Sequence, residues 1–150
     1  IFLNIFCNFV YEIIKLLNQK YPDKIGNALS DDDMVKVYAG SKIVLNIQES
    51  RKNNDIICPE VLYCANFRDF EVPMSGSMLL TQFSQELLLL YDEDKEIVTY
   101  KNEYEMIDKM KFYLKNYQQR KKIADAGHQR AINNHTWEHR FNDLFSYISL

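Results

Sequence analysis

Three short apolar runs alternate with stretches of helical periodicity along the chain. The runs are Ile43 to Ile47, Met78 to Thr81 and Ile97 to Tyr100, and turn-forming or polar residues bound each of them. Short runs of this kind are typical of strands in a parallel sheet that has helices on both faces. Because strands and helices alternate, the pattern predicts an α/β fold with a Rossmann-like parallel sheet flanked by helices.

Helices are predicted at both ends of the chain and between the strands. Ser30, Asn102 and Thr136 each precede an amphipathic stretch, and a short polar side chain at that position accepts a hydrogen bond from the first helical turn. The helical stretches are residues 2–16, 31–39, 66–75, 84–91, 102–117, 118–133 and 137–148. Residues 50–64 are polar, contain Pro59 and predict a loop.

The spacing of apolar residues also predicts which helix faces are buried. Leucines on every side of the helix over 84–91 predict that this helix is buried. Small residues in the helix over 118–133 permit close approach of another helix: Ala124, Gly127 and Ala131. The expected buried face of the helix over 102–117 comprises Ile107, Met110, Tyr113, Leu114 and Tyr117, and that of the last helix comprises Trp137, Phe141, Leu144, Phe145 and Ile148.

Composition and charge narrow the functional classes. A chain of 150 residues is long enough for one domain. With 18 basic and 21 acidic residues its formal charge is −3, which gives no overall attraction to nucleic acid or to anionic membrane. The apolar opening segment lacks a basic region and a cleavage site, so no transmembrane segment is expected. Three cysteines without a C-x-x-C pair favour the reducing cytoplasm.

A candidate binding site follows from the predicted sheet. Ligands of open parallel sheets lie beyond the carboxyl ends of the strands, where loops lead into helices. The loop after 43–47 leads to Arg68 and Glu71, and the strand that ends at Thr81 leads to a helix capped by Ser84. Helix N-termini and a guanidinium suit a phosphate, and a carboxylate suits the hydroxyls of a ribose. Gly76 either lets the backbone pass close to a ligand or bends it sharply into the next strand.

Each candidate also has a structural alternative. Arg68 has Asp69 and Glu71 as possible ion-pair partners, and Glu71 has a solvated surface position as its alternative. The three histidines are His128, His135 and His139; they have no acidic or thiol partner at ligand spacing, so no metal is expected, and His135 is assigned to a helix junction. Cys58 and Cys64 lack an activating base. Residues 49–52 follow a strand and are a charged loop or a second contact to the ligand.

Five blocks of sequence carry a family resemblance. They are "YAGSKIVLNIQES", "NFRDFEVPMSGSMLLT", "KEIVTYKNEYEMIDKMKFYL", "QRKKIADAGHQRA" and "HTWEHR". Together, over about residues 26–145, they resemble the C-terminal half of the spore-maturation (CgeB-type) glycosyltransferases, relatives of the group-1 retaining enzymes with the GT-B fold. The resemblance implies a nucleotide diphosphate sugar as donor substrate, no further cofactor, and an acceptor held by an N-terminal half. It also places the last helix near the domain boundary, so we expect that helix to pack through Trp137 and Phe141 and in part to serve the N-terminal half.

The resemblance also assigns roles to individual residues. Glu71 occupies the place of the second glutamate of the Glu-x7-Glu motif, which implies a contact to the donor ribose, and Gly76 follows five residues later as in the family pattern. Arg68 corresponds to the arginine of the R-x-F/x-E run and is the candidate for the diphosphate. Tyr63 stands where the first glutamate would contact the transferred sugar. The donor-binding set is therefore Arg68, Glu71, Gly76, Thr81 and Ser84, and the catalytic residue stays unassigned.

Two functional hypotheses follow. The first is an enzyme half: residues 26–150 bind the nucleotide sugar, and residues 1–25 are a helix and linker that belong to an upstream half, as the initial Ile1 suggests. The second is a non-catalytic module that binds a nucleotide or a partner without turnover. Tyr63 favours the second hypothesis, whereas Arg68, Glu71 and Gly76 favour the first.

Overall fold

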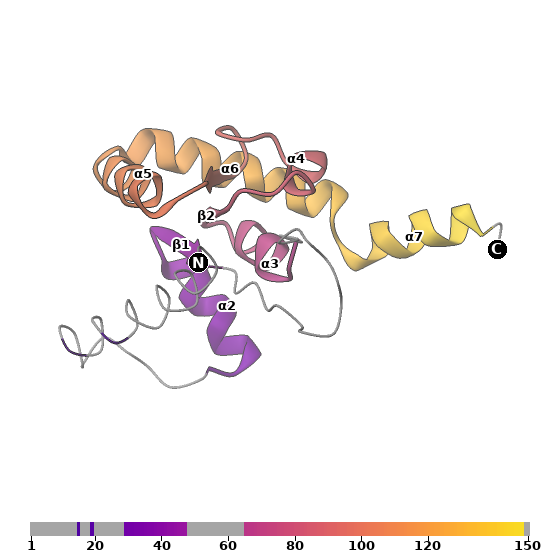
Figure 1. Ribbon diagram of the computed structural model, residues 1–150. Helices are drawn as coiled ribbons and strands as arrows, with labels where there is room; N and C mark the ends of the chain where they lie inside the picture. The colour runs from indigo at the N-terminus through magenta and orange to yellow at the C-terminus, as the bar shows by residue number, and fades with distance from the viewer. Residues whose placement is uncertain (1–14, 16–18, 20–28, 48–64, 149–150) are drawn as a thin grey trace.

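The computed structural model describes Lys15, Gln19 and residues 29–47 and 65–148 (Figure 1). In these ranges three strands form one sheet in the order β1-β2-β3, with both pairs parallel. The strands are β1 (Ile43–Asn46), β2 (Met78–Gln82) and β3 (Val98–Tyr100). Helix α3 (Arg68–Met74) lies between β1 and β2 in sequence, and α4 (Leu87–Leu90) lies between β2 and β3. The predicted α/β fold with a parallel, helix-flanked sheet is confirmed.

The predicted helix caps are also present. Helix α2 (Asp31–Gly40) begins after Ser30, whose side chain accepts from the Asp33 amide, and α5 (Glu103–Lys115) begins after Asn102. Helix α6 (Tyr117–Asn134) leads directly into α7 (Trp137–Tyr147), which is capped by Thr136. Capping depends on neighbouring residues alone, so local sequence is enough to predict it. The helix expected over 2–16 and the loop over 50–64, with Tyr63 and residues 49–52, lie outside the described residues.

The core is divided between the two faces of the sheet. All five positions of β2 are buried, because the strand lies between β1 and β3 and is covered on both sides. Neighbouring β2 residues point to opposite faces: Leu80 joins a cluster with residues of α5 and α6, whereas Leu79 joins a cluster with Val72 of α3 and Tyr91. The carboxyl ends of β1 and β2 therefore lie side by side next to the start of α3.

Two predicted burial patterns are wrong. Helix α4 has a single turn, so it offers only one residue to the core: Leu87 is buried, whereas Leu89 is 86% exposed. The inner face of α5 is formed by Met106, Met110 and Tyr113. Ile107 and Leu114 are exposed, because the rotation of the helix on the sheet is set by tertiary packing. Tyr117 is also exposed, and it belongs to the next helix, α6, because α5 ends at Lys115.

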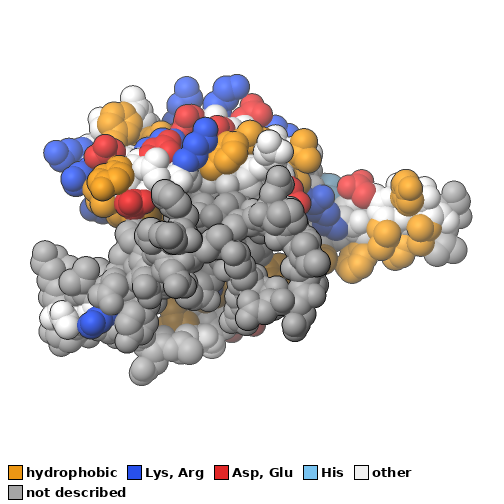
Figure 2. All heavy atoms as spheres, in the orientation of Figure 1, with side chains coloured by type: hydrophobic (Ala, Val, Ile, Leu, Met, Phe, Trp, Pro, Cys, Tyr) orange, Lys and Arg blue, Asp and Glu red, His pale blue; other side chains and the backbone are white. Residues whose placement is uncertain are grey.

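None of the residues of helix α7 is buried, so the expected packing of its stripe on this domain is not observed, whereas a stripe left open to a partner half fits the exposure. It extends away from the sheet and the other helices (Figure 1). The stripe expected to be buried is exposed and includes Trp137 at 68% exposure, with Phe141, Leu144, Phe145 and Ile148 at about half. Hydrophobic side chains gather along one side of this helix (Figure 2). The periodicity correctly indicates an apolar stripe, but no described element covers it.

The small residues of α6 allow this helix to pack closely against two different parts of the domain. A Cβ atom at Gly127 would overlap the carbonyl oxygen of Glu96, in the turn before β3. Ala131 packs in the cluster of Val72, and the ring Nδ1 of His128 lies 3.1 Å from the carbonyl oxygen of Pro73 in α3. The expected close helix approach therefore occurs with α3, whereas Gly127 lets α6 approach the turn that contains Glu96.

None of the described helices is long and apolar enough to cross a membrane.

Candidate functional site

A buried polar network joins the carboxyl ends of two strands to the start of α3. The Nδ2 atom of Asn46, the last residue of β1, donates to Asp69 Oδ1 at 3.0 Å, to Thr81 Oγ1 at 3.2 Å and to Asn66 Oδ1 at 3.3 Å. Thr81 Oγ1 of β2 in turn donates to Asp69 Oδ1 at 3.0 Å. The backbone N–H of Asn66 donates to the other carboxylate oxygen, Asp69 Oδ2, at 2.9 Å.

The network is almost completely shielded from water. Asp69 and Thr81 are fully buried, and Asn46 is 1% exposed. Removing a carboxylate from water is costly unless hydrogen bonds replace its hydration, and here side-chain and backbone donors do so. The hydroxyl of Tyr100, the last residue of β3, donates to the carbonyl oxygen of Asn46 at 2.9 Å. All three strands are thus fixed to one another at their carboxyl edge.

The two charged candidates lie on α3 beside this network. The side chain of Arg68 is exposed, and its backbone N–H donates to Asn66 Oδ1 at 3.0 Å. Glu71 is half-buried, one turn further along the helix. No ion pair of Arg68 or Glu71 is present in the part of the chain that the structure describes. The expected alternative, a pairing of Arg68 with Asp69 or Glu71, is therefore not observed, because Asp69 turns inward.

Thr81 and Ser84 lie at the same edge but face inward. The hydroxyl of Thr81 donates to Asp69 and accepts from Asn46. Ser84 is 5% exposed, and its Oγ accepts from the backbone N–H of Leu87 at 3.2 Å. These two residues shape the edge from within, whereas Arg68 and Glu71 carry the side chains that reach its surface.

Gly76 is placed apart from the other four candidates. It precedes β2 and therefore lies toward the amino edge of the sheet, where Ser77 Oγ donates to the carbonyl oxygen of Ser41 at 3.0 Å. Its φ of +82° is in the left-handed region that glycine tolerates best, and a Cβ there would meet no atom within 4 Å. Of the two explanations considered for Gly76, the sharp bend into the strand is the one this geometry fits.

The helices at the edge are too short to provide a strong anion site. Helix α3 has seven residues and α4 has four. Few aligned peptide dipoles add up in such short helices, and the first N–H of α4, that of Leu87, is already bonded to Ser84. The expected phosphate site at these helix N-termini is therefore weak, and the exposed side chain of Arg68 is the cation that α3 itself provides at this position.

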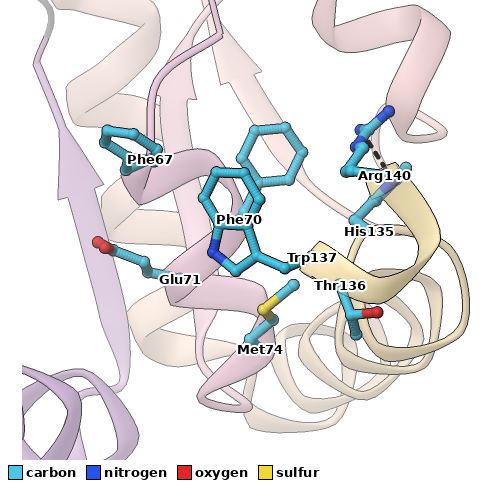
Figure 3. Close-up of a pocket in the computed structure, with 8 residues that line it drawn as sticks. All are labelled: Phe67, Phe70, Glu71, Met74, His135, Thr136, Trp137 and Arg140. Atoms are coloured by element: carbon cyan, nitrogen blue, oxygen red, sulfur yellow. Dashed lines mark hydrogen bonds between the residues drawn. The ribbon is translucent and has the colours of Figure 1, made fainter. Parts of the chain in front are cut away.

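An apolar groove of about 500 Å³ runs between α3 and the start of α7. Phe67, Phe70 and Met74 of the α3 segment face His135, Thr136, Trp137 and Arg140. Glu71 lies at the margin of this groove, and its carboxylate points away from Trp137 and His135 (Figure 3). The groove and the polar network thus lie on different sides of α3.

His135 forms the junction of α6 and α7, as expected. Its Nε2 lies 2.9 Å from the carbonyl oxygen of Leu90, so this nitrogen donates, and Nδ1 accepts from Arg140 Nη2 at 3.2 Å. The ring also packs edge-on against Tyr91 and Phe70. Burial lowers the pKa of His135, in agreement with a neutral ring. The described residues contain no group of three metal-ligating side chains.

Sequence reasoning missed Asn46, Asn66 and Asp69 as site residues. Asn46 had a visible signal, because an amide in the middle of the apolar run Ile43 to Ile47 needs partners when it is buried. Asp69 carried no such signal: its neighbours in sequence suggest a surface ion pair, and only the packing of α3 on β1 and β2 shows that it points inward.

Comparison with known proteins gives one family. The family model described as "Glycosyl transferase-like" matches residues 3–146. No match was found among curated proteins or among solved structures.

Proposed function

The chain belongs to the glycosyl transferase-like family, and from this premise we propose that it is the donor-binding half of a GT-B glycosyltransferase of the CgeB type. The family supports sugar transfer in general terms. The observation that carries the finer proposal is the polar network at the carboxyl edge, beside which α3 presents Arg68 and Glu71. This is the edge at which open parallel sheets bind nucleotides.

Two contacts to the donor define the proposed site. Arg68, exposed and free of an ion pair within the described ranges, binds the diphosphate. When the bond between the sugar and the diphosphate breaks, negative charge grows on the leaving group, and the guanidinium stabilises it by charge-assisted hydrogen bonds. Glu71 accepts hydrogen bonds from the ribose hydroxyls. Thr81 and Ser84 act indirectly, by holding the edge of the sheet.

The acceptor is proposed to bind to an N-terminal half. The exposed apolar stripe of α7, from Trp137 to Ile148, supports this proposal because a face of that kind is stabilised when a second body covers it. Transfer also requires the acceptor to be held against the donor in one geometry. We place the whole enzyme in the cytoplasm, on the basis of its cysteine pattern.

A second candidate function rests on one residue. Tyr63 replaces the first glutamate of the family motif, and a phenol does not supply the carboxylate expected at the transferred sugar. This substitution favours a module that binds a nucleotide without transferring a sugar. Both candidates share the donor site, so nucleotide binding is the property to test first.

The test is calorimetry with uridine diphosphate and guanosine diphosphate, in the presence of a chelator. The wild-type chain should bind one of them weakly, and Glu71→Ala should weaken binding roughly ten- to a hundredfold, because hydrogen bonds to charged groups contribute about 1.5–3 kcal/mol. Asp108→Ala, which removes an exposed carboxylate from α5, is the matched control and should bind like the wild type. Absence of binding at millimolar nucleotide, or equal affinity of Glu71→Ala and the wild type, would refute the site.

A further inference from the structure

We propose that Asp69 is a positioning residue, which holds the start of α3 in the orientation that presents Arg68 to the donor. This inference rests on the proposed donor site. Asp69 is fully buried and lies between the two candidate residues in sequence. It has no exposed surface to offer a ligand, so any contribution to binding acts through the residues that it holds.

A chain of hydrogen bonds through Asp69 and Asn66 connects the sheet to the backbone of Arg68. Its Oδ1 accepts from Asn46 at 3.0 Å and from Thr81 at 3.0 Å, which anchors the carboxylate to the ends of β1 and β2. Its Oδ2 accepts from the backbone N–H of Asn66 at 2.9 Å. The side chain of Asn66 then accepts from the backbone N–H of Arg68 at 3.0 Å. The backbone that carries Arg68 is therefore tied to the sheet through Asp69.

The network needs a carboxylate at this position. Among the described residues, each carboxylate oxygen of Asp69 faces donors: two side-chain groups lie at Oδ1 and one backbone N–H lies at Oδ2. An asparagine carries one oxygen and one NH₂ group, so either orientation of its amide would bring a donor against a donor. Asp69→Asn therefore preserves the shape of the side chain and removes the connection to Asn66 or to the strands.

The first measurement is nucleotide affinity, with the diphosphate that the wild-type chain binds. Asp69→Asn should weaken binding about tenfold, since the start of α3 loses a buried hydrogen bond. Thr81→Val, which removes one donor to Asp69 and keeps the shape, should weaken binding by a smaller factor. Val72→Ala is the control for general destabilisation: it truncates a fully buried residue of α3 that has no part in the network, and its affinity should stay within twofold of the wild type.

A double-mutant cycle separates positioning from a general structural effect. If Asp69 acts through Arg68, the loss caused by Asp69→Asn should largely vanish in the Arg68→Ala background. Additive losses from Asp69→Asn and Arg68→Ala would overturn the proposal, as would an Asp69→Asn affinity within twofold of the wild type. If Asp69→Asn does not fold, the same cycle is run with Thr81→Val and judged by the same criterion.

A second measurement keeps this test independent of the proposed function. Should the wild-type chain bind neither nucleotide, the donor site is refuted, but the connection from Asp69 to Arg68 can still be tested by amide hydrogen exchange. Asp69→Asn should speed exchange at the Asn66 and Arg68 amides by about tenfold relative to Val72→Ala, because both amides depend on the network. Equal protection in the two variants would show that Asp69 does not hold this segment.

Discussion

At the scale of single residues, the protonation state of His135 affects the stability of the fold. The ring donates from Nε2 to Leu90 and accepts at Nδ1 from Arg140, an arrangement that only the neutral ring can make. Protonation would set an imidazolium N–H against the Arg140 guanidinium. Burial is the main cause that lowers the pKa of His135, and the nearby Arg140 charge acts in the same direction.

The sign of the pH effect follows from this lowered pKa. In the unfolded chain the ring titrates near pH 6.5, whereas in the folded chain it stays neutral to lower pH. The unfolded state therefore binds more protons between the two pKa values, and the free energy of unfolding should decrease as the pH is lowered below about 6.5. Chemical denaturation at a series of pH values between about 5.5 and 8 measures this change in the free energy of unfolding. His135→Gln, which donates and accepts without titrating, should have a smaller slope, and identical slopes would contradict the account.

The inward turn of Asp69 marks the limit of residue-level prediction. Sequence identifies Arg68 and Glu71 as candidates because their charges stand beside the expected edge of a sheet. It does not show that Asp69, between them, is buried, because the direction of each side chain depends on how α3 rotates against β1 and β2. Thr81 and Ser84 are placed at the right edge from sequence, but their hydroxyls are bonded inside the protein.

At the scale of elements, the strands and the helix caps could be predicted because they depend on short stretches of sequence. Ser30, Asn102 and Thr136 each cap the helix that follows. The buried faces could not all be predicted, because they depend on which elements are available as partners. Leu89 of α4 is exposed since the helix has a single turn, and the stripe of α7 is exposed since no described element reaches it.

The packing of α6 against the turn before β3 gives a prediction at this scale. Gly127→Ala should destabilise the fold by about 1–3 kcal/mol or more, because the added methyl group would overlap the backbone carbonyl of Glu96, which has little room to move. Thermal or urea denaturation provides the measurement. Gly40→Ala in α2 is the matched control: a Cβ there meets no atom within 4 Å, so the change should be neutral or slightly stabilising. Equal stability of the two variants would show that α6 lies further from the turn.

At the scale of the whole molecule, the described part combines a compact α/β body with two surfaces that lack a covering element. One is the apolar groove between α3 and the start of α7 (Figure 3), and the other is the stripe along α7 (Figure 2). The groove lies beside the helix that carries Arg68 and Glu71, and the stripe begins at Trp137, which lines the groove, and continues away from the body (Figure 1). This arrangement fits a domain that meets a second body next to its donor site, as the proposed GT-B architecture requires.

The central claim is that a nucleotide diphosphate binds at the carboxyl edge of the sheet, and its most direct test is a titration followed by amide NMR. Uridine diphosphate or guanosine diphosphate should shift the amides of Asn46, Asn66, Arg68 and Glu71 and those of residues 81–84, and should leave the residues of α7 unchanged. Shifts confined to the groove residues Met74 and Trp137, or to the amino edge near Gly76, would contradict the claim, because they would place the ligand on another face of the domain.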